Sequence, residues 1–180
     1  FDDVVVIRCR GSGEIVISIV GQGRADCYDT PTGGGDLAVE AEVGNITDSG
    51  IITATGTSSF TTTAADADIT FDQVSLFTGA VSLATSGTDG DISITNVGQA
   101  LNLGTVTTTL GGDLTVETDV GNIIDSCLIS TSDTSDYTTP SVHVAITLDH
   151  LSSSSYVVPL ATTDNRRLST ITHAGPHSTL

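Results

Sequence analysis

Carboxylates are the commonest groups in this sequence that could do chemistry, and several of them lie close together near expected turns. They form three loose groups: Asp66, Asp68 and Asp72; Asp89 and Asp91; and Asp133 and Asp136. Oxygen ligands at such spacing suit Ca²⁺, which takes six to eight of them. The sequence contains neither a full Gly-Gly-x-Gly-x-Asp nonapeptide nor an EF-hand loop. Solvated turn carboxylates are therefore the preferred interpretation, Ca²⁺ is the alternative, and no other cofactor is predicted.

An enzyme built on these carboxylates is the second hypothesis. A glycosidase needs two carboxyl groups about 5 to 9 Å apart, and the many Asp residues leave such a pair open. However, Trp is absent, only 4% of residues are aromatic, and neither a Gly-x-Ser-x-Gly nor a His-Glu-x-x-His motif occurs. We therefore predict no catalytic residue, and a carbohydrate-active or carbohydrate-binding protein is the alternative.

The histidines offer a weaker metal candidate. All four lie in the last forty residues, and two of them, His173 and His177, have the spacing of metal ligands on a helix. Gly175 and Pro176 between them exclude a regular helix. We predict no metal site there.

The charge distribution excludes several partners. Lys and Arg number 5 against 22 Asp and Glu, which gives a formal net charge of −17. The five cations lie near the ends, at Arg8, Arg10, Arg24, Arg166 and Arg167. Such a surface repels phosphate backbones and anionic lipids. We expect no nucleic-acid partner and no membrane insertion, because no apolar stretch reaches the length of a span. Multivalent cations or neutral and cationic polymers, such as the glycans of other cells, fit better.

The elements that carry these residues are predicted from a long internal repeat. The segment from Gly35 to Gly50 returns from Gly112 to Cys127 with eleven of sixteen positions identical, which is an offset of 77 in the numbering. Within the repeat, apolar-x-apolar doublets mark short strands with two inward side chains. These doublets are Leu37/Val39, Ile69/Phe71, Val81/Leu83, Ile92/Ile94, Leu101/Leu103 and Leu114/Val116. They recur after about 20 to 25 residues, which is typical of one coil of a parallel β-helix.

The predicted fold is therefore all-β: a right-handed parallel β-helix, or β-solenoid, with irregular ends, in which three or four coils fill one repeat unit and each coil sits on a near copy of itself. A β-sandwich is the alternative. We divide the chain into an N-terminal cap or extra coil (1–34), a β-helical repeat region (35–130), and a C-terminal strand at 142–148 followed by a Ser/Thr-rich tail (131–180). Open solenoid ends need caps or pair with one another, which predicts self-association into a homo-oligomer or filament.

Cysteine and asparagine spacing adds two structural predictions. Cys9 and Cys27 are close to one coil apart, so they suit either a disulfide between adjacent coils or two buried thiols. Cys127 is expected to be a small buried residue. Asn45 and Asn122 occupy the same repeat position, where a turn ladder that hydrogen-bonds adjacent coils is favoured over glycosylation of the Asn45-Ile46-Thr47 sequon.

The repeat Gly-Asp-Leu-x-Val…Gly-Asn-Ile-x-Asp-Ser resembles large exoproteins of the filamentous haemagglutinin and adhesin type, as do Gly79-Ala80-Val81-Ser82-Leu83 and Ala100-Leu101-Asn102-Leu103-Gly104. The resemblance covers 35–130. It implies a secreted or cell-surface bacterial fibre with a structural role in adhesion or biofilm. The absence of Met and of a basic leader fits a processed product or a piece of a longer protein.

Overall fold

The computed structural model describes residues 3–8, 15–19, 23–29, 35–141, 144–149, 151–154, 160–162 and 170–171, with side chains described for 35–73, 75–141 and 144–149. The strands are β1 Asp3–Arg8, β2 Ile15–Ile19, β3 Gly23–Asp29, β4 Leu37–Ala41, β5 Ile46–Ala54, β6 Ser58–Ala65, β7 Ile69–Phe77, β8 Val81–Ser86, β9 Ile92–Asn96, β10 Leu101–Thr107, β11 Leu114–Thr118, β12 Ile123–Asp125, β13 Ile129–Thr131, β14 Ser135–Thr139, β15 Ile146–Leu148, β16 Leu151–Ser154, β17 Leu160–Thr162 and β18 Thr170–Ile171. Within these residues there is no helix, and hence no long apolar helix of the kind that crosses a membrane.

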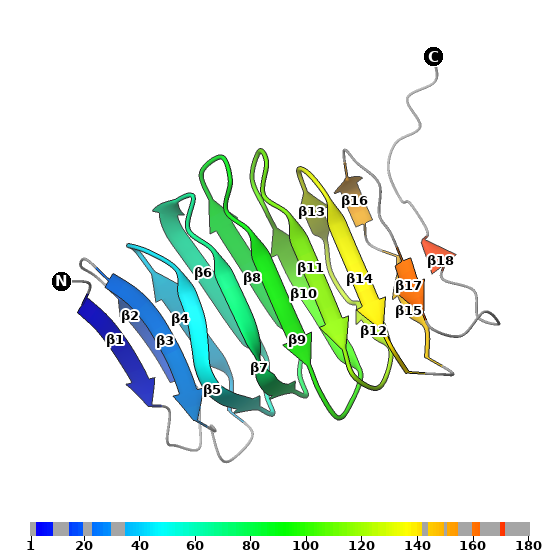
Figure 1. Ribbon diagram of the computed structural model, residues 1–180, viewed down its shortest axis with the longest axis horizontal. Coiled ribbons are helices and arrows are strands. Elements are labelled where there is room, and N and C mark those ends of the chain that lie inside the picture. The colour runs from blue at the N-terminus through cyan, green and yellow to red at the C-terminus, as the bar shows by residue number, and fades with distance from the viewer. Residues whose placement is uncertain are drawn as a thin grey trace.

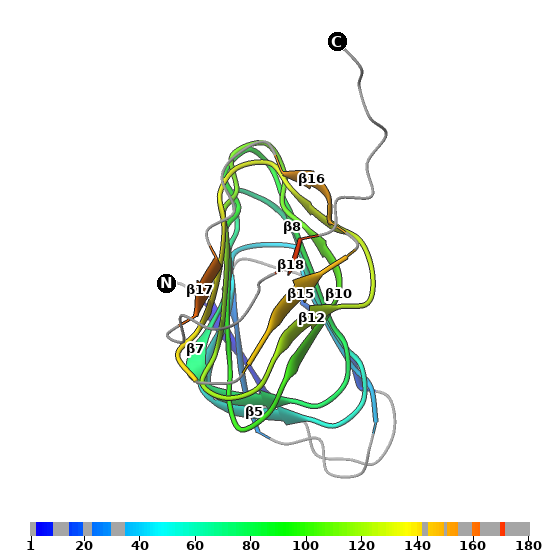
Figure 2. The same cartoon turned by 90° about the vertical axis from the view of Figure 1, so that its right-hand side faces the viewer.

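Successive strands alternate between two sheets that lie face to face (Figures 1 and 2). One is an eight-stranded sheet with the order β1-β3-β5-β7-β9-β11-β14-β17. The other is a ten-stranded sheet with the order β18-β15-β12-β10-β8-β6-β4-β2, to which β13 and β16 add. The strand pairs β1–β3, β4–β6, β5–β7 and β9–β11 are parallel, as are the others. The predicted β-solenoid is confirmed, and a sandwich of antiparallel strands is excluded.

One coil contains about 22 residues, a length within the range of solenoid repeats. In the eight-stranded sheet, Ala25 lies opposite Ile46, which lies opposite Ile69. Ile69 in turn lies opposite Ile92. This register matches the spacing of the apolar doublets, because each coil stacks its doublet on the doublet of the preceding coil.

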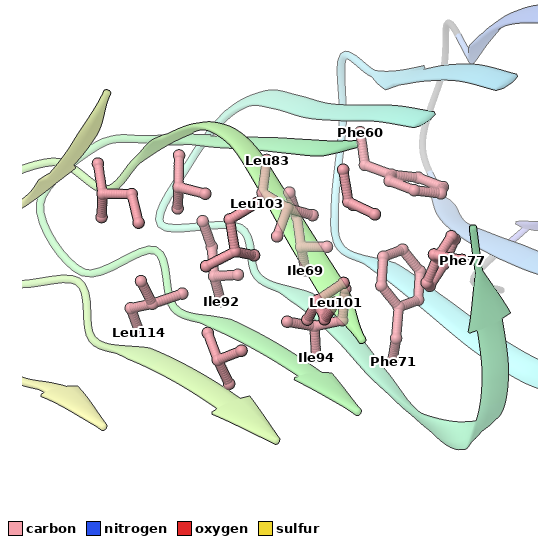
Figure 3. Packing of buried hydrophobic residues seen from close by; sticks show 14 of the residues in the cluster. Phe60, Ile69, Phe71, Phe77, Leu83, Ile92, Ile94, Leu101, Leu103 and Leu114 are labelled. Atoms are coloured by element: carbon pink, nitrogen blue, oxygen red, sulfur yellow. The ribbon is translucent and has the colours of Figure 1, made fainter. Parts of the chain in front are cut away.

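The core runs along the axis between the sheets. Every doublet that the sequence predicts to face inward is buried, with Leu37 at 3% exposure as the most exposed of these side chains. Phe60, Phe71 and Phe77 pack together near one end of the labelled cluster in Figure 3. The ring centroids of Phe60 and Phe71 are 4.5 Å apart in an edge-to-face arrangement. Apolar burial is therefore continuous from coil to coil.

The two copies of the sequence repeat lie on opposite sheets, which corrects the expectation that each coil sits on a near copy of itself. Leu37–Ala41 is β4 of the ten-stranded sheet, whereas the matching Leu114–Thr118 is β11 of the eight-stranded sheet. The reason is that the repeat offset corresponds to three and a half coils of about 22 residues each. Gly44 and Gly121, at the same repeat position, both have positive φ, 77° and 95°. The structural unit is thus half a coil.

The C-terminal region continues the same stack. β14 pairs with β11, and β15 pairs with β12, so the coils extend beyond residue 130. The strand predicted at 142–148 is shorter, since β15 begins at Ile146 and residues 142–143 lie outside the described part. Ala145 instead belongs to the turn, where its carbonyl accepts a hydrogen bond from the backbone N–H of Ile123.

Candidate functional site

Polar side chains concentrate where the chain passes from the ten-stranded to the eight-stranded sheet, at the top of Figure 1; we call this edge the Asp corner. Asn45, Asp68, Asp91 and Asp113 each stand directly before a strand of the eight-stranded sheet. The Asn45 Oδ1 atom accepts the Asp68 amide at 3.0 Å, and Asp68 Oδ1 accepts the Asp91 amide at 3.0 Å. Asp91 Oδ1 then accepts the Asp113 amide at 2.9 Å. The four side chains form one ladder parallel to the axis.

This ladder carries several negative charges. No Lys or Arg occurs in the sequence between Arg24 and Arg166, and Arg24 directly precedes Ala25, which lies opposite Ile46. Burial raises the pKa of Asp91, and the charges of Asp113, Asp68 and Asp89 raise it further against a hydrogen bond from the Asp113 amide. Asn45 fills the first position with the same Oδ1 bond and no charge. Hydrogen bonding at this position therefore does not require a carboxylate.

A second ladder lines the inside of the same corner. Thr62, Thr85, Thr108 and Thr131 recur at a constant interval of 23 in the numbering and are all at most 4% exposed. The hydroxyls of Thr62 and Thr85 donate to the carbonyls of Ala67 and Gly90, at 3.1 and 2.8 Å, and thereby close each turn. Thr108 does the same with Gly112 at 2.8 Å. These hydroxyls satisfy backbone carbonyl groups at the change of sheet.

Asn45 and Asn122 both bond to the next coil, but on opposite corners. The Asn122 Oδ1 atom accepts the Ala145 amide at 2.8 Å, as Asn45 accepts that of Asp68. Neither side chain lies in the core, since Asn45 is half-buried and Asn122 is exposed. The Nδ2 atom of Asn45 also donates to Asp68 at 3.2 Å, so the sequon amide is already hydrogen-bonded.

The five Asp residues that the sequence offers as Ca²⁺ ligands take part in different hydrogen bonds. Asp68 and Asp91 belong to the ladder, and the Asp66 carboxylate accepts the amides of Thr88 and Asp89 in the next coil. The hydrogen bonds from Thr88 hold the pKa of Asp66 below its usual value. Asp72 lies in β7, where it accepts a bond from Gln73. Among the described residues, no three His, Cys, Asp or Glu side chains gather as a metal site requires, and Ca²⁺ binding stays a prediction.

Strands β5 and β7 each contain a bulge at the same level, and a buried carboxylate forms hydrogen bonds between the two bulges. Between Asp48 and Ile52, β5 has two more residues than β3 has between Cys27 and Asp29. Strand β7 likewise has two more residues between Phe71 and Ser75 than β9 has between Ile94 and Asn96. The backbone pairing of β5 with β7 stops at Thr47 and resumes at Thr53.

Side chains supply the missing hydrogen bonds. Asp48, only 8% exposed, accepts the amides of Asp72 at 3.0 Å and Gln73 at 3.2 Å. The Ser75 hydroxyl donates to Asp48 at 3.3 Å and accepts the Ile52 amide at 3.1 Å. Burial raises the pKa of Asp48, and these hydrogen bonds offset only part of that rise. Three donors thus converge on one charge in the interior.

The second repeat copy places a buried Asp at the corresponding position on the other sheet. Asp125, 9% exposed, accepts the amide of Asp149 at 2.9 Å, and these two residues have the same sequence separation of 24 as Asp48 and Asp72. Behind each buried Asp, a large aliphatic side chain points outward: Ile51 is 57% exposed and Leu128 is 47% exposed. A buried Asp that accepts an amide from the next coil is therefore a repeated feature of the solenoid.

The remaining predicted residues are placed only in part. Cys27 pairs with Ile7 of β1 in register, while Cys9 lies outside the described residues, so the disulfide stays a prediction. Cys127 is exposed, which contradicts the expectation that it is buried. Asp133 lies in the Asp corner and Asp136 in β14. His143, His150, His173 and His177 all fall outside the described residues.

The sequence held a signal for the threonine ladder that the doublet pattern alone does not use. An apolar residue and a threonine two positions later recur at a fixed interval of 23: Phe60/Thr62, Leu83/Thr85, Val106/Thr108 and Ile129/Thr131. Asp48 and Ser75 gave no comparable signal, because only the coil register brings residues 27 positions apart into contact.

Comparison with known proteins gives one family match. Residues 21–84 match a family described as repeats of unknown function (DUF5649), a stretch that includes β3 to β7 and the start of β8. No curated protein and no solved structure matches the chain. In this stretch the chain is therefore similar to a repeat family for which no activity is described, in keeping with its coiled architecture.

Proposed function

We propose that this chain is a segment of the shaft of an extracellular or cell-surface fibre, with a structural and adhesive role. The unbroken parallel pairing of strands in both sheets is the observation that carries the proposal. Such a stack distributes load over many backbone hydrogen bonds and gives a length that grows with the number of coils. The repeat-family match over 21–84 supports the same view.

The outward face of the shaft supports contact with neutral or cationic polymers. In the eight-stranded sheet, Thr70, Ser93 and Thr115 lie side by side and form a row of hydroxyl-bearing residues. The acidic net charge of −17 disfavours nucleic acid and anionic lipid. Host or neighbour-cell glycans and further copies of the chain are the partners that we propose, and Ca²⁺ is the cation that fits this surface best.

Single-molecule force spectroscopy tests the structural role. With the chain held between inert handles, we expect discrete unfolding steps. One coil of about 22 residues releases about 7 nm of contour, given about 3.5 Å per extended residue and about 4.8 Å of rise per coil. Steps of this size or its multiples support a shaft that yields coil by coil. Smooth extension at low force contradicts a load-bearing role.

A further inference from the structure

The outer face of the ten-stranded sheet carries little charge. Strands β6, β8, β10, β12, β13 and β15 and the segment 126–128 contain one carboxylate between them, that of Asp125, which is buried. We call the outward side of these strands the neutral face; in Figure 2 it lies opposite β7 and β17. On the other sheet, Asp72, Glu117 and Asp136 lie in β7, β11 and β14, and none of the three is buried. In a chain with a net charge of −17, the neutral face is therefore an exception.

Apolar side chains project from the neutral face. Ile124 of β12 is 37% exposed, and Leu128, which directly precedes β13, is 47% exposed. The Leu128 carbonyl accepts the Val106 amide at 3.0 Å, so the backbone of this residue is fixed against β10 while its side chain meets solvent. Thr105, also exposed, lies at the same level of β10, because Val106 is opposite Ile129. Covering these side chains removes apolar surface from water, which favours association.

Charge determines what can cover this face. The edges of the neutral face are acidic: the Asp corner borders it along one side, and Glu40 of β4 and Asp149 after β15 lie at its two ends. A cationic partner is attracted to those carboxylates and to the other sheet, not to a face without charge. A sugar ring finds no aromatic side chain to stack on, since the single aromatic residue of these strands, Phe60, is buried. Two copies of the chain, however, approach each other with least repulsion when both present this face.

The size of the neutral face fits a weak pair. It spans five neighbouring positions of the sheet, at β6, β8, β10, β12 with β13, and β15, which is about 24 Å at about 4.8 Å each. Along the longer strands β8 and β10 it extends for six and seven residues, or about 20 Å. Two copies that cover this face bury about 1,000 Å² in all, which is the lower limit for a specific interface.

We propose that two copies of the chain pair laterally through the neutral face, with Ile124 and Leu128 of each copy covered by the other. The inference rests on the proposed binding between copies of the chain and names its surface. Such a pair is isologous, because the same face of each copy meets its equivalent. The acidic edges of the two copies come close together, so salt, which screens their repulsion, strengthens the pair.

Sedimentation velocity under reducing conditions tests the pairing on the unmodified chain. Between about 10 μM and about 1 mM protein, we expect the dimer fraction to rise with concentration, as for other interfaces at this size limit. At one protein concentration, we expect it to rise again when NaCl is raised from about 10 mM to about 300 mM. The reducing agent keeps the exposed Cys127 as a thiol, so that a disulfide does not account for the dimer.

Charge variants at repeat-equivalent positions locate the surface. Leu128→Asp places two like charges in each isologous pair, and we expect the dimer dissociation constant to rise at least about tenfold. Ile51→Asp is the matched control, because Ile51 is the exposed aliphatic residue at the equivalent repeat position on the other sheet. It adds the same charge to the chain and is expected to leave the dimer unchanged. Thr105→Asp, at an exposed strand position, is expected to weaken the dimer as Leu128→Asp does, and it decides the matter where that variant fails to fold.

Three results overturn the proposal. The first is a chain that stays monomeric over the whole concentration range at both salt levels. The second is association that neither Leu128→Asp nor Thr105→Asp weakens, which places the contact away from the neutral face. The third is equal weakening by Ile51→Asp, which shows that net charge alone is responsible. The unfolding steps of a single chain under force do not depend on pairing, so the failure of this inference and that of the proposed function are distinguishable.

Discussion

Asp48 and Asp125 are the same residue of a sequence repeat, yet they lie on opposite sheets of the solenoid. Both are buried, and each accepts a backbone amide from the next coil at the same sequence separation of 24. The equivalence extends to Gly44 and Gly121, which turn the chain with positive φ on the opposite corners. The repeating structural unit is thus a half coil, and its strand can belong to either sheet.

The inner threonine ladder is expected to stabilise the coils. Thr85 is 4% exposed and donates to the Gly90 carbonyl at 2.8 Å. Thr85→Val keeps the shape and leaves that carbonyl without its buried donor, which costs about 1 to 3 kcal/mol. Denaturant unfolding measures the loss. The control Thr95→Val changes an outward residue of β9 and is expected to alter stability by less than about 0.5 kcal/mol; equal effects of the two variants contradict the assigned role.

Asp91 is expected to cost the protein less stability in mild acid than at neutral pH. Because the folded-state pKa of Asp91 is raised, its penalty is present above that pKa and is relieved as the pH falls through it toward the ordinary value of 3.8. Asp91→Asn keeps an oxygen for the Asp113 amide and removes the charge. We expect it to stabilise the protein at pH 7 by a few tenths of a kcal/mol to about 1 kcal/mol, and to give no gain below the ordinary pKa.

Asp119→Asn is the matched control for this charge effect. Asp119 also accepts a cross-coil amide, that of Gly98 at 2.7 Å. The residues at its level in the neighbouring coils, Val97 and Pro140, are uncharged. We expect little change in stability at pH 7. A stabilisation as large as that of Asp91→Asn shows that net charge alone, and not the ladder, is responsible.

Close stacking at the corner opposite the Asp corner is expected to require glycine at position 79. A Cβ atom there lies 2.1 Å from the Gly56 carbonyl oxygen, a backbone atom that cannot move away independently. Gly79→Ala is therefore expected to destabilise the protein by about 2 kcal/mol or more, in the range of overpacked sites. Thermal unfolding measures the change. A melting temperature equal to that of the unaltered chain excludes so tight a contact between these coils.

The apolar doublets predicted the strands and their inward faces because alternation along a strand fixes which side chains meet the core. Residues such as Thr85 and Asn96 are buried as well, although they lie outside the apolar doublets. Their hydrogen bonds run to backbone atoms at the corners, which alternation does not describe. The half-coil offset was hidden because the offset between the two repeat copies does not state the coil length. The doublets give that length only as about 20 to 25 residues, and the constant spacing of the buried threonines narrows it.

The most direct test of half-coil stacking is the distance between the two equivalent positions 50 and 127. Spin labels on Gly50→Cys and on the native, exposed Cys127 serve this purpose once Cys9 and Cys27 are replaced by Ser. Three and a half coils separate the two backbone positions by about 17 Å along the axis, and the sheet spacing adds about 10 Å across it. Labels that extend outward from opposite sheets lengthen the distance across the axis further, whereas labels on one face do not.

A control pair at Thr47→Cys and Asp136→Cys, with Cys127 also replaced by Ser, lies four coils apart on one face, about 19 Å along the axis. In pulsed electron paramagnetic resonance, we expect a longer distance for the pair at 50 and 127 than for this control, despite the shorter axial separation. A distance equal to or below that of the control places both repeat copies on the same face and contradicts half-coil stacking.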